Sequence, residues 1–206
     1  MIKDIPEIAL QRLPVYLNYL KTLPNKERSS ISSGAIANAL GLGEVLVRKD
    51  LAYTSAVGKP RVGYNTLELI SAIEEFLGCN HTKNAVIVGV GGLGRAILSY
   101  GGFSKYGIEI TAAFDNDEKK AGTEISGKKI HSPKDMSGVI AQTHATLAVL
   151  CVPASAAQAI ADELIKCGIC GILNFAPLQI NAPEGVTVRN IDVAANLAIL
   201  SSIVMN

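Results

Sequence analysis

The stretch VGVGGLG at residues 88–94 constrains the fold of this chain more than any other feature. Gly89, Gly91 and Gly94 have the spacing G-x-G-x-x-G, after a short apolar run and before a helical pattern. In a strand–loop–helix unit the first glycine permits the tight turn, the second lets a pyrophosphate approach the backbone, and the third lets the helix pack on the strand. The N–H groups and the dipole at the helix N-terminus favour phosphates. The stretch therefore predicts a dinucleotide site in an α/β domain.

An acidic residue follows at the position that such a site requires. Asp115 ends the next predicted strand, IEITAAFD at 108–115, and lies 21 residues after Gly94. A carboxylate there accepts hydrogen bonds from the ribose hydroxyls and repels the 2′-phosphate of NADP, so NAD is favoured, with Lys119 and Lys120 nearby weakening the preference. From the loop and this strand we assign to the nucleotide site Gly89, Val90, Gly91, Gly92, Leu93, Gly94 and Asp115.

The chain changes its pattern near residues 78–84. After this point apolar runs alternate with helical patterns, which is typical of a parallel α/β sheet. Strands are predicted at 85–90, 108–115, 145–153 and 169–175, and helices at 93–104 and 155–168. Before it, the periodicity predicts only short helices, at 10–20, from the capping pair Ser32 and Ser33 to about 40, at 44–53 and at 66–77. The apolar face of the second of these helices includes Ile36, Ala39 and Leu40.

The end of the chain, DVAANLAILSSIVMN, is an apolar helix with few charges. A monomer would expose it, so we expect it to pack against a second subunit in a homodimer. The predicted domains are residues 1–80, 81–192 and 193–206.

Positive charge gathers in the N-terminal part. Between residues 45 and 64 there are four basic residues and one acid, a local charge of +3 in a chain whose net charge is +1. On a helical wheel Val45, Arg48 and Lys49 share one side of the helix at 44–53, and the apolar residues Leu46, Val47 and Leu51 occupy the other. Asp50 falls in this apolar sector and should find a hydrogen-bonding partner. The segment SAVGKPRVGYN that follows predicts a hairpin with Lys59 and Arg61 at its tip.

This pattern suits double-stranded DNA. Arginine pairs with guanine edges, lysine with phosphates, and a small apolar side chain with a thymine methyl group, while a basic hairpin tip reaches phosphates or an AT-rich minor groove. The alternative is a solvated charged face. A winged-helix DNA-binding domain is favoured, and its predicted contacts are Val45, Arg48, Lys49, Lys59 and Arg61.

Other site classes find little support in the residues. No paired Tyr and Lys has Y-x-x-x-K spacing, and His81, His131 and His144 fall near predicted loops, so no catalytic residue is predicted. Cys167 and Cys170 form a C-x-x-C without a second pair, which favours a structural use over a metal or redox site. No apolar run is long enough for a membrane span and MIKDIPE lacks a signal-peptide core, so we expect a cytoplasmic protein.

Two further readings stay open on these observations. The chain could be a small NAD-dependent oxidoreductase whose helical N-terminal part binds a substrate or a partner. The absence of a plausible catalytic acid or base argues against this function. A Rossmann domain of this type also resembles CoA-binding domains, which would make the ligand an acyl-CoA, against which stands Asp115.

Taken together the motifs resemble the Rex family, bacterial repressors that sense the NADH to NAD balance. The resemblance extends over nearly the whole chain and lies in RLPVYLNYL at 12–20, VRKDLAY at 47–53, GKPRVGY at 58–64, VGVGGLG at 88–94, AAFDND at 112–117, GILNFAP at 171–177 and NIDVAANL at 190–197.

The resemblance implies a winged-helix N-terminal domain, a Rossmann-type parallel-sheet domain, and a C-terminal helix swapped into the partner of a homodimer. It implies NAD and NADH as ligands, and a palindromic, AT-rich operator from which NADH releases the protein. Arg12, Tyr100 and Asp192 match positions of a ligand-sensitive contact network, and Tyr100, Val152 and Pro153 are added to the nucleotide site. Val193 stands where some members carry an aromatic residue near the nicotinamide.

Overall fold

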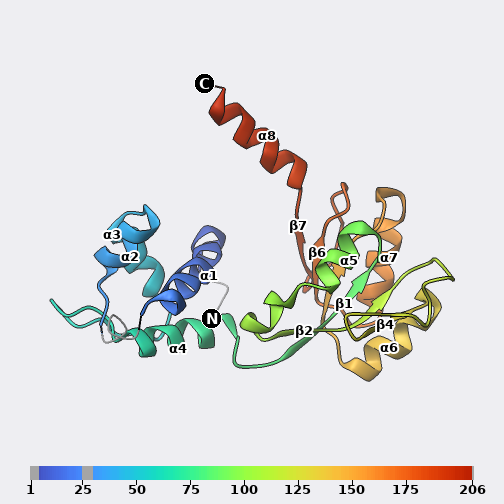
Figure 1. Cartoon of the computed structure of the whole chain (residues 1–206), viewed down its shortest axis with the longest axis horizontal. Helices are drawn as coiled ribbons and strands as arrows, with labels where there is room; N and C mark the ends of the chain where they lie inside the picture. The colour runs from blue at the N-terminus through green and yellow to red at the C-terminus, as the bar shows by residue number, and fades with distance from the viewer. Residues whose placement is uncertain (1–4, 25–29, 206) are drawn as a thin grey trace. The chain divides into compact units, whose positions relative to one another are not determined.

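The computed structural model describes residues 5–24 and 30–205. They fall into two compact units, Met1–His81 and Thr82–Asn206, and each unit is described by itself (Figure 1). The prediction about a signal peptide falls partly on residues 1–4, outside this range. Within the described residues no helix is long and apolar enough to cross a membrane.

The N-terminal unit consists of four helices, α1 (Glu7–Thr22), α2 (Ser33–Leu40), α3 (Glu44–Leu51) and α4 (Thr66–Leu77). The Ser32 side chain accepts a hydrogen bond from the backbone N–H of Ala35, so it caps α2 as predicted. Ala37, not the expected Ala39, lies in the core beside Ile36, on the side of α2 that is buried. The largest apolar side chains of this core are Leu13, Leu17, Leu20, Ile36, Leu51, Leu69 and Ile73.

The segment between α3 and α4 is a turn rather than a regular strand pair. Lys59 and Gly63 exchange two backbone hydrogen bonds of 2.8 and 2.9 Å, and Tyr64 pairs with Ile31 in the same antiparallel way. Arg61, at the tip, has a φ of 63°. The predicted hairpin is therefore present in a minimal form, anchored at its base on the segment that precedes α2.

The C-terminal unit contains a seven-stranded sheet with the order β3-β4-β2-β1-β5-β6-β7. Its strands are β1 (Lys83–Val88), β2 (Ile108–Phe114), β3 (Glu124–Ile125), β4 (Lys128–His131), β5 (Leu147–Leu150), β6 (Gly171–Asn174) and β7 (Thr187–Asn190). All neighbours are parallel except β3 and β4. The four predicted strands are confirmed. The short strands β3, β4 and β7 were not predicted, because they have few apolar residues.

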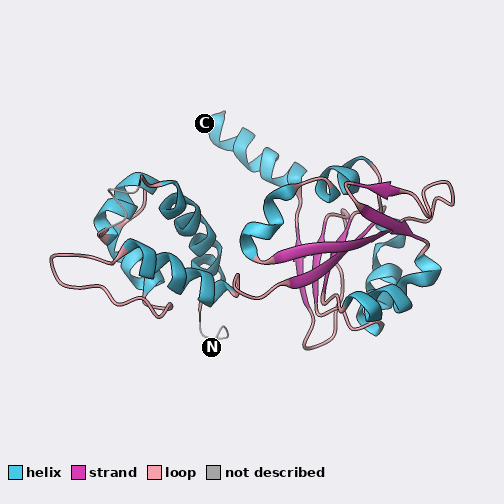
Figure 2. Cartoon of the chain, turned by 60° about the horizontal axis from the view of Figure 1, so that its bottom comes forward, coloured by secondary structure: helices cyan, strands magenta, loops and turns pink. Residues whose placement is uncertain are grey.

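Helices cover both faces of this sheet (Figure 2). On one face α6 (Met136–Thr143) and α7 (Ala154–Lys166) pack over Val86, Val88 and Phe114. On the other, α5 (Gly92–Leu98) and the 3-10 helix η3 (Gly101–Tyr106) pack over Ala85, Ile87 and Ile110. A second 3-10 helix, η4 (Pro133–Asp135), precedes α6. The sequence did not predict α6.

The predicted helix at 93–104 is wrong in its second half, since α5 ends at Leu98. After Tyr100 the chain continues as η3, where the Tyr100 ring occupies the place that a side chain at Gly102 would take. The last helix, α8 (Val193–Val204), agrees with the prediction. None of its residues is buried, and Leu197, Leu200 and Ile203 are each more than half exposed.

Candidate functional site

The carboxyl ends of four parallel strands in the C-terminal unit lie in one row. Val88 of β1 is paired with Phe114 of β2 and with Leu150 of β5, and Leu150 is paired with Asn174 of β6. The next residues of these strands, Gly89, Asp115, Cys151 and Phe175, therefore leave the sheet at the same edge. In open α/β sheets this edge is the binding edge, at the point where the connections diverge. Here they diverge on the two sides of β1.

The glycines of the loop after β1 differ in what surrounds them. Gly89 has a φ of 92°, and an added Cβ would overlap the carbonyl oxygen of Cys151. A Cβ on Gly94 would overlap the carbonyl oxygen of Gly89, so close packing of α5 requires glycine there. Nothing lies within 4 Å of a Cβ built on Gly91. Two glycines are thus required by the fold, whereas at Gly91 the backbone faces open space that a ligand can use.

Asp115 is buried beside this loop with its oxygens engaged. Oδ2 accepts from the backbone N–H of Val90 at 2.7 Å and from Nζ of Lys120 at 2.9 Å, and Oδ1 accepts from the N–H of Asp117 at 2.9 Å. Burial by itself raises the pKa of Asp115, but these donors outweigh it and hold the pKa below its ordinary value. The carboxylate therefore orders the loop.

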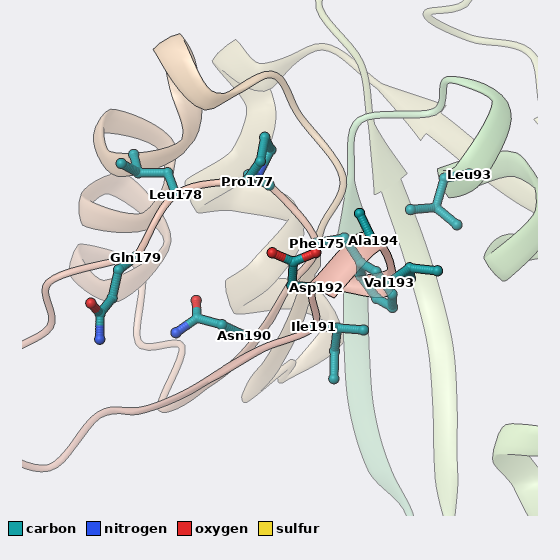
Figure 3. Close-up of a pocket in the computed structure, with 11 residues that line it drawn as sticks. Leu93, Phe175, Pro177, Leu178, Gln179, Asn190, Ile191, Asp192, Val193 and Ala194 are labelled. Carbon is teal, nitrogen blue, oxygen red and sulfur yellow. The ribbon is translucent and has the colours of Figure 1, made fainter. Parts of the chain in front are cut away.

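Two cavities open along this edge. The smaller, of about 230 Å³, lies between the glycine loop, Asp115, Lys120, Val152 and Pro153. The larger, of about 700 Å³, extends from Leu93 to the segments that follow β6 and β7 (Figure 3). Figure 3 shows Leu93 on one side, Pro177 and Leu178 on the other, and Val193 at the start of α8 between them.

Asn174 shapes the larger cavity. It is fully buried, its amide nitrogen donates to the carbonyl oxygens of Ala176 and Leu178 and to Oδ1 of Asn190, and its Oδ1 accepts from the N–H of Ala176. The loop after β6 is thereby tied to the end of β7. Phe175, Pro177, Asn190 and Ile191 were not predicted as site residues, although the motifs GILNFAP and NIDVAANL pointed to these segments.

Some of the remaining residues predicted for the nucleotide site are accessible to a ligand and others are not. Gly92 has open space around it and Leu93 is 48% exposed, whereas the Val90 side chain is fully buried and its N–H is used by Asp115. Tyr100 is brought to neither cavity. Its ring lies edge-on to Phe103, with centroids 5.4 Å apart, beside a third cavity with Ser104 and Lys128.

In the N-terminal unit the predicted DNA contacts are all exposed. Val45, Arg48 and Lys49 project from α3, and Lys59 and Arg61 from the turn that follows. Among the described residues no ion pair involves these four cations. Val47, Asp50 and Leu51 form the buried side of α3, and Leu46, expected there, is 38% exposed.

Asp50 was expected to have a hydrogen-bonding partner, and its partners are two side chains of α1. Arg12 donates from Nε to Oδ2 at 2.6 Å and from Nη2 to Oδ1 at 2.8 Å, and the Tyr16 hydroxyl donates to Oδ2 at 2.6 Å. Hydrogen bonding to Asp50 raises the pKa of Arg12, and burial together with Asp50 raises the pKa of Tyr16 to about 12. Arg12 therefore stays charged and Tyr16 stays protonated at any physiological pH.

Asp192 stands at the N-terminus of α8, where its Oδ1 accepts from the backbone N–H of Ala195 at 2.8 Å.

Burial raises the pKa of the Cys151 thiol to about 11, which makes it unreactive. Cys167 is half-buried against the core and Cys170 is exposed. In the part of the chain that the structure describes, no cluster of three or more His, Cys, Asp or Glu side chains is placed to hold a metal.

Two family models match separate parts of this chain. The model of a putative DNA-binding protein N-terminus matches residues 4–52, and the model of a CoA binding domain matches residues 80–178. The two matches correspond to the helical unit and to the sheet unit.

Relatives match nearly the whole chain. The redox-sensing transcriptional repressor Rex of Carboxydothermus hydrogenoformans is 41% identical over 96% of this chain and 95% of its own length. Rex of Streptomyces griseus is 36% identical over 97% of this chain and 79% of its own length. A crystal structure of RSP, a Rex-family repressor, with β-NAD+ and operator DNA has a TM-score of 0.92 at 30% identity, covering 98% of this chain and 93% of its own. This chain therefore belongs to the Rex family of redox-sensing transcriptional repressors.

Proposed function

We propose that this chain represses transcription by binding operator DNA through its N-terminal unit, and that NADH bound at the sheet edge releases it. The observation that carries the proposal is the agreement over 98% of the chain with a Rex-family repressor that holds both β-NAD+ and operator DNA. The same repressor has been crystallised with β-NADH and matches with a TM-score of 0.87. The oxidoreductase alternative is not supported, since the relatives are repressors.

The dinucleotide would lie along the row of strand ends. The open backbone at Gly91 and Gly92 would receive the pyrophosphate, and the smaller cavity beside Asp115 and Lys120 would receive the adenosine half. The nicotinamide would then reach the larger cavity past Leu93. Because Lys120 already neutralises much of the Asp115 charge, we infer that Asp115 acts mainly by holding the loop.

The lining of the larger cavity supports discrimination between the two redox forms. Phe175, Pro177, Ile191 and Val193 present apolar side chains, and the nicotinamide ring is cationic in NAD and neutral in NADH. Moving a cation into an apolar, water-poor site costs free energy that the neutral ring does not pay. NADH would therefore stabilise the state in which this cavity is closed.

Closure would require a second copy of the chain. The exposed apolar side chains of α8 begin directly after the cavity residue Val193, and we propose that this helix is swapped into the partner of a homodimer. The three-part division into residues 1–80, 81–192 and 193–206 is proposed on the same basis.

Arg12, Tyr100 and Asp192 are proposed as the contacts that relay the closure of the cavity to the DNA-binding unit. Two of the five N–H donors of Arg12 are used by Asp50, so donors remain for a further partner.

DNA contacts are proposed for Val45, Arg48 and Lys49 in the major groove, and for Lys59 and Arg61 at the turn. These side chains are exposed and lie on consecutive parts of one unit. Arginine and lysine supply base-edge and phosphate contacts, and the apolar Val45 supplies a methyl contact.

Fluorescence anisotropy of a labelled operator duplex tests the function directly. The operator is first selected by the protein from a random-sequence pool, and NADH, NAD, NADPH or CoA is then titrated into the complex. We expect NADH to release the duplex at concentrations where NAD does not, and CoA to have no effect. Equal effects of NADH and NAD would contradict redox sensing, and release by CoA alone would favour the acyl-CoA alternative.

A further inference from the structure

The buried carboxylate of Asp50 lies on the inner side of the helix that carries the proposed DNA contacts. Asp50 is 2% exposed, although it directly follows the exposed Arg48 and Lys49 in α3. Its three donors all come from α1, where Arg12 and Tyr16 are four residues apart and therefore share one face of that helix. One carboxylate thus joins two helices of the N-terminal unit.

Stability alone does not account for this arrangement. A buried ion pair loses about as much through desolvation as it gains in attraction, and apolar side chains of similar volume often replace it without cost. What the ion pair fixes is the orientation of the Asp50 side chain. The planar guanidinium of Arg12 holds both carboxylate oxygens, and this two-point contact fixes the orientation of the Asp50 side chain, which a single contact would leave free to turn.

The orientation of Asp50 determines where its neighbours point. Successive residues of an α-helix are rotated by about 100°, so turning Asp50 toward α1 directs Lys49 and Arg48 away from it. A rotation or slide of α3 that moved Asp50 away from Arg12 and Tyr16 would leave a buried charge unpaired, which is strongly unfavourable. The contact therefore restrains both the rotation and the axial position of α3.

We propose that Asp50, held by Arg12 and Tyr16, is a positioning residue that aligns α3 for reading the operator. Asp50 itself touches no base. It acts by holding Arg48 at the spacing and angle that base-edge contacts require, whereas phosphate contacts such as the one proposed for Lys49 tolerate a looser helix. This inference rests on the proposed function and extends it to the basis of operator selectivity.

Electrostatics and positioning predict opposite results for Asp50→Asn. Removing an acid beside DNA increases the positive charge, which strengthens binding to any duplex. If Asp50 positions α3, the variant instead loses affinity for the operator while its affinity for random-sequence DNA is unchanged or higher. We expect the operator to random-DNA affinity ratio to fall by roughly tenfold or more, the size of one lost base-edge contact.

The milder variant Tyr16→Phe keeps the buried ring and removes one hydrogen bond to Asp50. It protects the test against a failure of Asp50→Asn to fold, and we expect a fall of about threefold in the same ratio. Arg12 is not substituted, because it is also a proposed switch contact.

Glu74→Gln is the matched control. It removes the ion pair between Lys21 of α1 and Glu74 of α4, whose N···O distance is 2.6 Å and which lies in the same unit away from α3. We expect no change in the affinity ratio from this variant.

All proteins are measured by anisotropy at one salt concentration, well below their unfolding temperatures, together with their affinities for NADH. Equal losses on operator and random DNA, an unchanged ratio in both Asp50→Asn and Tyr16→Phe, or the same loss in Glu74→Gln would each overturn the proposal. A wild-type protein without preference for any selected duplex would instead overturn the proposed function itself. The two failures are therefore distinguishable.

Discussion

The two units present their proposed ligand contacts by different means. In the N-terminal unit the contacts are exposed side chains, Arg48 and Lys49 on α3 and Arg61 on the turn, and the core beneath them does not use them. In the C-terminal unit the contacts are backbone atoms of a glycine loop, and two of its glycines are required by the packing of the same loop. The exposed DNA contacts can therefore be removed without disturbing the core, whereas two glycines of the nucleotide loop cannot be changed without disturbing the fold.

Both units hold their contact segment with one buried carboxylate. Asp50 is bound by side chains of another helix, whereas Asp115 is bound by two backbone N–H groups and by Lys120 five residues later. A helix already has its own hydrogen bonds and needs only to be oriented. A loop without regular structure needs its backbone donors satisfied.

The largest effect should separate two glycines of the same loop. Gly94→Ala places a Cβ against the carbonyl oxygen of Gly89, so we expect the C-terminal unit to lose about 3 kcal/mol or more of its free energy of unfolding. Gly91→Ala has room for its Cβ and a φ of −78°, so its unfolding should match the wild type. Its affinity for NADH should nevertheless fall by at least about tenfold, because the methyl group occupies the approach of the pyrophosphate.

Urea denaturation and NADH fluorescence titration measure these two quantities on each variant. Normal NADH binding by Gly91→Ala would place the pyrophosphate elsewhere. A Gly94→Ala protein as stable as the wild type would show that α5 can move away from the loop.

An intermediate effect should appear in the N-terminal unit. Removing an exposed side chain from α3 leaves its core intact, so Arg48→Ala should keep the wild-type unfolding curve and NADH affinity. Its affinity for the operator should fall by about 1–3 kcal/mol, and Lys49→Ala should weaken operator and random DNA alike. Anisotropy at several salt concentrations measures both. Joint loss of DNA and NADH binding in Arg48→Ala would show that Arg48 supports the fold rather than contacting DNA.

The smallest effect concerns the charge of Asp115. Its pKa is lowered in the folded protein, so the stabilisation that it provides is present above the ordinary aspartate pKa and is lost as the pH falls through the lowered value. We expect wild type to exceed Asp115→Asn by about 1 kcal/mol in free energy of unfolding at pH 7, with the difference shrinking below about pH 4. Urea titrations at both pH values check this, and a difference independent of pH would mean that the charge does not matter.

Much of the sheet unit was predictable because its signals are local. The strand before Gly89, the turn itself and the acid at the end of the next strand follow one another within 33 residues, from 83 to 115. Both strands are short apolar runs, and glycine is required where φ is positive or a helix packs closely. The exposed cations of α3 were predictable for the same reason, since a helical wheel involves only near neighbours.

The larger cavity was not predictable from such local signals. Phe175, Asn190 and Ile191 lie far from the glycine loop in sequence, and only the parallel register of β1, β5, β6 and β7 brings their segments to one edge. β7 is short and contains a single apolar residue, Val188, so no pattern in its own sequence marks it as part of the sheet.

By itself the sequence determined the four main strands, most of the helices, the glycine loop and the basic face, because these depend on spacing, capping and charge between residues close along the chain. Only the tertiary structure decided how the two buried carboxylates are used. Asp50 could be expected to have a partner, but Arg12 and Tyr16 are 38 and 34 residues away and meet it only when α1 packs on α3. The ribose contact predicted for Asp115 remains a prediction, and the fold adds that its oxygens accept from the loop, since a buried charge takes the donors that the fold places beside it.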